Sequence, residues 1–189
     1  MARSDNIHEL PADLPVPVDD GACDHLPGMS VPSVRLESTA GRMIDLSAFP
    51  GRTVVYCYPR TGRPDVELPA GWNAIPGARG CTPESCGFRD RFQELQSLGA
   101  DVFGLSTQDS DYQREAAKRL HLPFEILSDA ALGFARALRL PTFHVDDMTL
   151  IKRLTLVLRG GKIEKVFYPV FPPDTHAEEV AAWLAINPR

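Results

Sequence analysis

The sequence lacks any long apolar run. No stretch approaches the roughly 20 consecutive apolar residues that a membrane-spanning helix needs. The start, Met1 to His8, also lacks the apolar core of a secretory signal. Basic residues are not in excess, and the net charge of −5 argues against nucleic acid or an anionic membrane as the main partner. We therefore expect a cytoplasmic protein that binds neither nucleic acid nor membrane.

Cysteine and histidine are also sparse. Four cysteines and five scattered histidines occur in 189 residues, and no Cys-x-x-Cys pair is present. The glycine patterns of dinucleotide and P-loop nucleotide sites are absent too. We therefore expect no metal and no cofactor. A zinc or iron–sulfur module stays an alternative, although the one close pair, Cys81 and Cys86, does not have the spacing of the usual ligand pairs.

That close pair lies in the segment from Gly80 to Asp90, GCTPESCGFRD. The segment has the residues of a helix start, with Thr82 as a candidate N-cap and Pro83 as the first helical residue. A thiol at such an end faces unpaired backbone N–H groups and the positive end of the helix dipole. Both favour the reactive thiolate, so the sequence predicts a lowered pKa for Cys81.

The spacing of the two cysteines has a geometric consequence. On a regular helix, residues i and i+5 differ by about 7.5 Å in rise and about 140° in azimuth. Their Cα atoms are then roughly 8–9 Å apart, beyond the range of about 4.4–6.8 Å that a disulfide tolerates. Cys81 and Cys86 therefore cannot form a disulfide unless the first helical turn unwinds.

Composition indicates one globular domain, because 43% of the residues are hydrophobic and 24% are charged. Residues 1–28 are rich in Pro and Asp, which predicts an extended N-terminal arm, and residues 29–189 form the domain. Strand and helix patterns alternate and indicate an α/β fold. Residues 60–79 predict a long functional or mobile loop. We expect strands at 33–38, 43–46, 52–59, 101–107, 124–127, 150–159 and 162–170, and helices at about 82–98, 110–121, 130–138 and 177–186.

Four features in this order resemble the peroxiredoxins, and among them the Q type, also called bacterioferritin comigratory proteins. They are Tyr58-Pro59, the segment from Gly80 to Asp90, Leu127-Ser128-Asp129 and Arg153. The resemblance extends over about residues 28–185. It implies a thioredoxin-like fold, with a central mixed sheet flanked by helices, and a chain that is a monomer or a weak homodimer.

The resemblance also implies an activity, that of a thiol peroxidase acting on hydrogen peroxide and organic hydroperoxides. By similarity, Cys81 is the peroxidatic cysteine, and Cys86 resolves its sulfenic acid as an intramolecular disulfide. Arg153 matches the arginine that holds the thiolate and the departing oxygen, and Pro59 matches the proline that shields the thiol. A thioredoxin-like protein is the implied reductant.

One departure from the family pattern concerns the residues before Cys81. The family has Pro-x-x-x-Thr-x-x-Cys, but Ala74 and Ala78 stand at those positions here. An insertion at 62–79 explains this, and Thr61 then becomes a candidate for the hydroxyl that orients peroxide. Thr61 is equally an ordinary loop residue. In that case a backbone N–H, or a loop side chain such as Arg79, must help to position the substrate.

Several residues keep two interpretations. Glu84 either complements the helix dipole, the preferred role, or pairs with an active-site arginine. Cys57 has the pattern of a buried small hydrophobe, and Cys23 is either incidental or an alternative resolving thiol. The alternative function is that of a general thiol–disulfide oxidoreductase. The missing Cys-x-x-Cys and the absence of proline between Thr142 and Tyr168, where such proteins carry a cis-proline, argue against it.

Overall fold

The computed structural model describes residues 6–188. Its main sheet has seven strands in the order β2-β1-β5-β4-β3-β8-β9. The central strands β3, β4 and β5 are parallel, while β8 pairs antiparallel with β3, and β1 pairs antiparallel with β5. The sheet is therefore mixed, as the sequence predicts. The strands are β1 (Arg35–Ser38), β2 (Met43–Asp45), β3 (Arg52–Cys57), β4 (Ala100–Ser106), β5 (Ile126–Ser128), β8 (Leu154–Arg159) and β9 (Lys162–Phe167).

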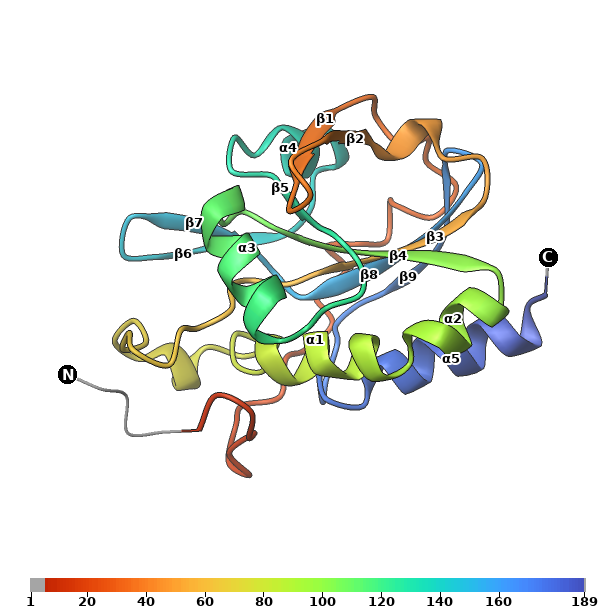
Figure 1. Ribbon diagram of the computed structural model, residues 1–189. Coiled ribbons are helices and arrows are strands. Elements are labelled where there is room, and N and C mark those ends of the chain that lie inside the picture. The colour runs from red at the N-terminus through yellow and green to blue at the C-terminus, as the bar shows by residue number, and fades with distance from the viewer. Residues whose placement is uncertain (1–5, 189) are drawn as a thin grey trace.

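Helices cover both faces of this sheet. In Figure 1, α1, α2 and α5 lie along one face, below the sheet, and α4 lies above it. Every residue of β3 is buried, since Val54 and Tyr56 pack toward one face and Val55 and Cys57 toward the other. A strand buried on both faces reads as a continuous apolar run. The α-helices are α1 (Cys81–Asp90), α2 (Phe92–Ser97), α3 (Ser110–Arg119), α4 (Gly133–Leu138) and α5 (His176–Ile186).

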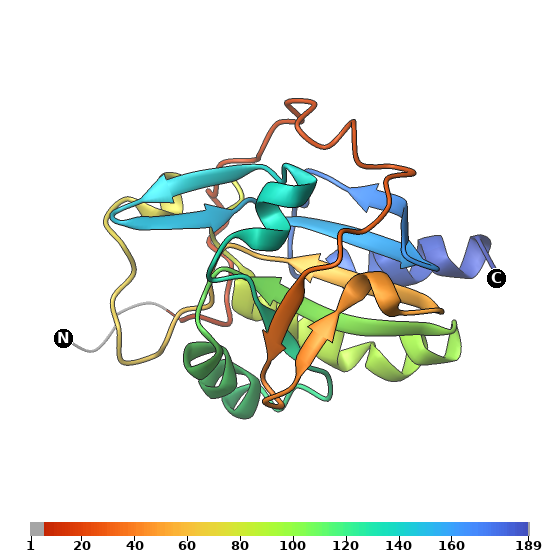
Figure 2. The ribbon, with the colours of Figure 1, turned by 90° about the horizontal axis from the view of Figure 1, so that it is seen from above.

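Two predicted elements are divided in the structure. The helix expected at about 82–98 is interrupted at Arg91 and forms α1 and α2. The strand expected at 150–159 is interrupted at Lys152 and Arg153, which lie between β7 (Met148–Ile151) and β8. β7 pairs instead with β6 (Thr142–Val145), which the sequence did not predict, and this hairpin projects from the main sheet in Figure 2. The interruption frees Arg153 from strand pairing at the edge of the site.

The described part of the N-terminal arm, residues 6–28, contains no helix or strand and packs against the domain. Leu26 and Cys23 are buried in the core on the α4 side of the sheet. Where the arm ends, the Gly28 N–H bonds the Ile163 carbonyl and the Val31 N–H bonds that of Gly161, so the chain runs along the edge strand β9. The division at residue 28 remains a prediction, and residues 1–5 lie outside the described part. No helix within residues 6–188 has the length and apolar character needed to cross a membrane.

Candidate active site

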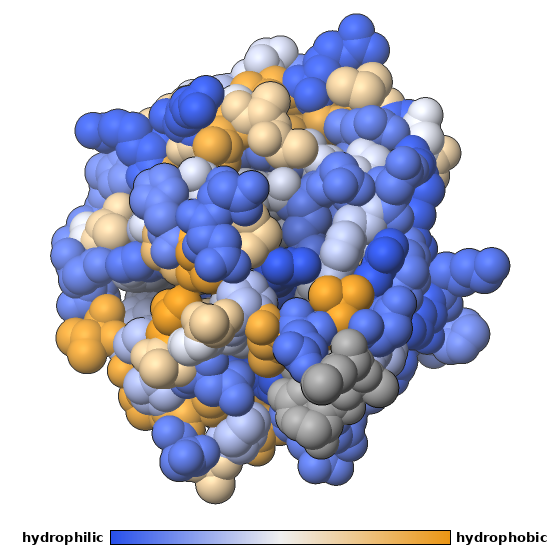
Figure 3. Space-filling model, turned by 90° about the vertical axis from the view of Figure 1, so that its left-hand side faces the viewer, coloured by the Kyte–Doolittle hydropathy of each residue, from blue (hydrophilic) through white to orange (hydrophobic). Residues whose placement is uncertain are grey.

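Strand pairing brings three distant segments to one end of the sheet. β3 and β8 are neighbours, with Cys57 opposite Leu154, so the end of β3 lies beside the start of β8. Pro59 follows β3 by two residues, and Arg153 directly precedes β8. The chain returns to this place at Cys81, the first residue of α1. The face at this end of the molecule, turned to the viewer in Figure 3, has small groups of apolar side chains among polar ones.

The Cys81 thiol meets the Arg153 guanidinium there. Arg153 Nη2 lies 3.1 Å from Cys81 Sγ, and both residues are 3% exposed. Carbonyls of the preceding loop hold the guanidinium: Nε donates to Gly77 at 3.3 Å, and Nη2 donates to Ala78 at 3.3 Å and Arg79 at 3.2 Å. Arg153 is thus anchored by the chain that leads into Cys81, and its Nη2 faces the sulfur.

A second acid shares this cation. Glu84 is fully buried, and its Oε2 accepts a hydrogen bond from Arg153 Nη1 in an ion pair. The preferred interpretation of Glu84, as a complement to the helix dipole alone, was therefore wrong. Glu84 lies one turn along α1 from Cys81, so its carboxylate reaches the same guanidinium. The sequence alone could not decide between this ion pair and an interaction with the helix dipole.

The prediction of a lowered pKa for Cys81 is also wrong for this closed arrangement. Burial raises the pKa of the Cys81 thiol, while the charge of Arg153 opposes that rise. The carboxylate of Glu84 adds to the increase, and the backbone N–H of Arg60 reduces it. Burial likewise raises the pKa of Glu84, against the pull of Arg153. The positive charge of Arg153 thus stabilises two buried acids, the Cys81 thiolate and the Glu84 carboxylate. The more strongly Arg153 interacts with Glu84, the less it stabilises the thiolate.

Helix α1 begins two residues earlier than its capping pattern predicts. Gly80, not Thr82, is the N-cap, and no side chain caps the helix. Gly80 has φ +105°, and a Cβ there would lie 2.3 Å from Pro173 Cγ and 2.9 Å from Leu10 Cδ2. Both the backbone conformation and the space therefore require glycine directly before Cys81.

Cys86 lies on the same unbroken helix, and both thiols are free. Cys86 is partly exposed. Partial burial raises its pKa, and the neighbouring Arg89 opposes that rise. The roles of Cys81 as peroxidatic and Cys86 as resolving cysteine remain predictions, as does the unwinding that would join them.

Thr61 is buried, and its hydroxyl donates to Gln108. Gln108 Oε1 accepts hydrogen bonds from the Thr61 N–H at 2.9 Å and from its hydroxyl at 3.2 Å. Gln108 Nε2 and Tyr112 Oη donate to the Thr61 carbonyl, at 3.3 Å and 3.0 Å. The backbone N–H that faces Cys81 belongs to Arg60. The sequence allowed for such a backbone donor. It gave no indication of Gln108, which hydrogen-bonds the segment after β3 at Thr61, because no local sequence pattern marks this residue.

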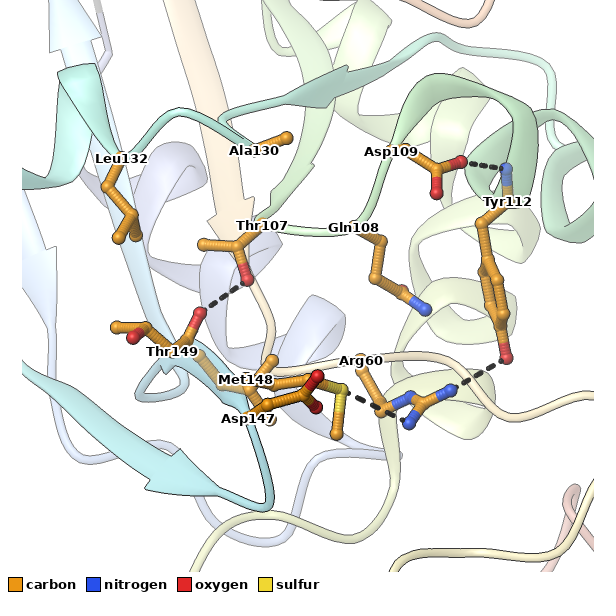
Figure 4. A pocket seen from close by; sticks show the side chains of 11 residues that line it. Arg60, Thr107, Gln108, Asp109, Tyr112, Ala130, Leu132, Asp147, Met148 and Thr149 are labelled. Atoms are coloured by element: carbon orange, nitrogen blue, oxygen red, sulfur yellow. Dashed lines mark hydrogen bonds between the residues drawn. The ribbon is translucent and has the colours of Figure 1, made fainter.

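The side chain of Arg60 lines a cavity of about 420 Å³ (Figure 4). Figure 4 shows its guanidinium between Met148 and Tyr112. Nη1 lies 3.4 Å from Met148 Sδ, and Nη2 lies 3.4 Å from Tyr112 Oη. Gln108 and Asp109 also line this cavity. Arg60, in the segment after β3, lines both this cavity and the one beside Cys81.

Cys81 itself opens on a much smaller cavity, of about 20 Å³. Side chains and backbone from the arm, the 60–79 loop and α1 enclose it, among them Trp72, which is 3% exposed. The lining residues are Ile7, Arg60, Gly62, Leu68, Trp72, Arg79, Gly80, Cys81 and Thr82.

The other two cysteines lie in the core. Burial raises the pKa of Cys57 well above its usual value, and it raises the pKa of Cys23 to about 12. Both are thus poorly suited to form thiolates. Within residues 6–188, no group of three or more His, Cys, Asp or Glu side chains is arranged to hold a metal ion.

Comparisons with known proteins identify the family of the chain. The redoxin family model matches residues 26–183. The chloroplastic peroxiredoxin Q of Sedum lineare is 32% identical over 159 residues, which make up 83% of this chain and 76% of that protein. The chloroplastic peroxiredoxin Q of Oryza sativa subsp. japonica is 32% identical over 154 residues, or 80% of this chain. The match spans only 63% of the length of that rice protein.

Solved structures show the same fold. Peroxidoxin BcpB from Mycobacterium tuberculosis superposes with a TM-score of 0.70 at 26% identity, over 86% of this chain and 98% of that one. Peroxiredoxin Q from Xanthomonas campestris gives 0.64 at 21% identity, over 93% and 98%. The predicted thioredoxin-like fold is confirmed. The chain belongs to the redoxin family, as a peroxiredoxin of the Q type.

Proposed function

We propose that this protein is a thiol peroxidase that reduces hydrogen peroxide and organic hydroperoxides, with Cys81 as the peroxidatic cysteine. The observation that carries the proposal is the 3.1 Å approach of Arg153 Nη2 to Cys81 Sγ at the first residue of a helix. A guanidinium stays charged when buried and offers several donors in one plane. It can therefore bind the sulfur and the oxygen of a peroxide together.

In the first step, the Cys81 thiolate attacks one peroxide oxygen. The S–O bond forms as the O–O bond breaks, and the departing oxygen leaves as water or an alcohol after taking up a proton. Negative charge develops on that oxygen, and Arg153 and the Arg60 N–H are the fixed donors beside the sulfur that can stabilise it. The product is a sulfenic acid on Cys81.

In the second step, the Cys86 thiolate attacks the Cys81 sulfur. The S–S bond forms as the S–O bond of the sulfenic acid breaks, and the oxygen leaves as water after taking up a proton. This needs the first turn of α1 to unwind, because the two cysteines are five positions apart on an intact helix. An external dithiol, which we propose to be a thioredoxin-like protein, then reduces the disulfide by exchange. That cycle suits a monomer or weak homodimer in a reducing cytoplasm, although the plant relatives are named chloroplastic.

Two cysteine variants test the cycle in a coupled assay with hydrogen peroxide, thioredoxin and its reductase. Cys81→Ser should abolish peroxidase activity. Cys86→Ser should keep the first oxidation in a single turnover and lose recycling. Peroxidase activity that persists without the Cys81 thiol would refute the proposal, and normal turnover without the Cys86 thiol would reject its resolving role.

The alternative, a general thiol–disulfide oxidoreductase, predicts fast reduction of insulin disulfides and no preference for peroxide. The free thiols and the thioredoxin-like fold are compatible with it. The burial of Cys81, at 3% exposure, disfavours it, since a protein disulfide must reach the attacking sulfur.

A further inference from the structure

A short turn of the N-terminal arm lies over the Cys81 cavity. Asn6 and Glu9 close this turn: the Glu9 N–H bonds the Asn6 carbonyl at 3.3 Å, and Asn6 Nδ2 bonds Glu9 Oε1 at 2.9 Å. The His8 N–H also bonds Asn6 Oδ1, at 3.0 Å. Ile7 therefore sits within a turn that its own hydrogen bonds shape, and we call residues 6–9 the arm turn.

Arg79 fastens the arm turn to the site. Its Nη2 donates to the Asn6 carbonyl at 2.8 Å and to the Glu9 carbonyl at 3.4 Å, the two ends of the turn. Arg79 precedes Gly80 and Cys81 in the chain, and its own carbonyl accepts a hydrogen bond from Arg153. The arm turn is thus held by the same backbone that positions the reactive thiol.

Ile7 closes the cavity beside the sulfur. Its side chain is only 8% exposed, although it lies near the chain terminus, and it lines the Cys81 cavity together with Leu68 and Trp72. Leu10 continues the cover by packing on Gly80. The remaining volume of about 20 Å³ is near the minimum of about 10–15 Å³ that one water molecule needs. A hydroperoxide with an alkyl or aryl group does not fit unless this cover moves.

We propose that Ile7 is a specificity-determining residue, the tip of a lid that admits hydrogen peroxide to Cys81 more readily than bulky organic hydroperoxides. This inference rests on the proposed role of Cys81. The lid opens by lifting the arm turn, which breaks the Arg79 contacts and leaves α1 in place. Hydrogen peroxide needs a small opening, whereas a bulky hydroperoxide needs Ile7 to leave the cavity.

The test compares Ile7→Ala with the parent protein by stopped-flow fluorescence, using hydrogen peroxide and cumene hydroperoxide. His8→Ala is the matched control, because His8 lies in the same turn and is exposed. For Ile7→Ala we expect the rate constant with cumene hydroperoxide to rise about tenfold, equivalent to about 1.4 kcal/mol in the barrier. With hydrogen peroxide the rate should change by less than about threefold, and His8→Ala should match the parent for both. Arg79→Gln, which loosens the turn and keeps the Ile7 side chain, should shift the preference in the same direction.

Alkylation of Cys81 separates failure of the lid from failure of the proposed function. Iodoacetamide and the larger N-ethylmaleimide are applied to reduced protein, and labelling of Cys81 is followed by peptide mass spectrometry. The lid predicts that Ile7→Ala accelerates the larger reagent more than the smaller one. If Ile7→Ala changes neither the ratio of the two alkylation rates nor the ratio of the two peroxide rates, the lid proposal is wrong. Accelerated labelling in a protein whose Cys81 reacts with no peroxide would instead overturn the proposed function and leave the lid standing.

Discussion

Replacing Arg153 by glutamine should raise the pKa of Cys81 and slow its reaction with peroxide. The substitution removes the positive charge that lies 3.1 Å from the sulfur and leaves a shorter, neutral polar side chain. Burial already raises the pKa of Cys81, and Arg153 is the largest influence in the opposite direction. Without it, less thiolate is present at neutral pH.

The magnitude follows from the geometry of the pair. Two unit charges about 4 Å apart attract by about 4 kcal/mol at an effective dielectric constant of about 20, which corresponds to about 3 pKa units. Arg153 also pairs with Glu84, so Cys81 receives only part of this stabilisation. We expect an increase of about 1–3 pKa units, and a similar number of decades lost from the rate at pH 7. The donor lost at the departing oxygen should cost about a further hundredfold.

The assay measures Cys81 alkylation by iodoacetamide against pH, which gives the pKa, and peroxide oxidation by stopped flow. Arg153→Gln alone leaves Glu84 as a buried carboxyl without its cation, a change that often costs about 3–5 kcal/mol in stability. The double variant Arg153→Gln, Glu84→Gln removes both charges and serves as the folded control. The double variant is compared with Glu84→Gln alone, because removal of Glu84 by itself changes the Cys81 pKa. Should the two variants agree in that pKa within about 0.3 unit and in peroxide rate within about twofold, the charge of Arg153 is not what activates the thiol.

Three further outcomes are expected. Glu84→Gln removes a carboxylate that competes for the guanidinium, so it should lower the pKa of Cys81 and speed its alkylation at pH 7; an unchanged or higher pKa would contradict this competition. Gln108→Ala removes the side chain that holds the segment after β3 and should slow peroxide oxidation about tenfold; a rate equal to that of the parent would deny it a positioning role. Because the pKa values of Cys23, Cys57 and Cys81 are raised in the fold, their contribution to stability is complete below about pH 8.5 and is lost as the pH rises further. The urea concentration at the midpoint of unfolding should therefore decrease as the pH is raised above about 8.5. A midpoint that stays constant up to about pH 10.5 would argue against buried neutral thiols.

Much of the fold could be predicted because its signals are local. The run from Val54 to Cys57 is apolar, as expected for a strand buried on both faces, and Gly160-Gly161 joins β8 to β9 as expected. The hairpin of β6 and β7 was missed. Its strands are only four residues each and have mixed burial, so they carry no clear alternation.

The parts of the candidate site that lie in one sequence segment could be predicted, whereas the parts that depend on tertiary contacts could not. Cys81 and Cys86 stand in a single segment, and the family pattern identifies Arg153. The roles of Glu84 and Gln108 arise from contacts between residues 69 and 47 positions apart, which no local pattern encodes. The pKa of Cys81 depends on burial beneath the arm and the 60–79 loop. The sequence does not show this burial, so the direction of the pKa shift was predicted wrongly.

The most direct test of the central claim is to identify what one equivalent of hydrogen peroxide does to the reduced protein. The reaction is followed by intrinsic fluorescence, with Trp72 beside the Cys81 cavity as a reporter, and the product is digested and analysed by mass spectrometry. The account predicts a fast phase and one disulfide-linked product that joins Cys81 to Cys86. Oxidation as slow as that of free cysteine, or a product that leaves Cys81 unmodified, would contradict it.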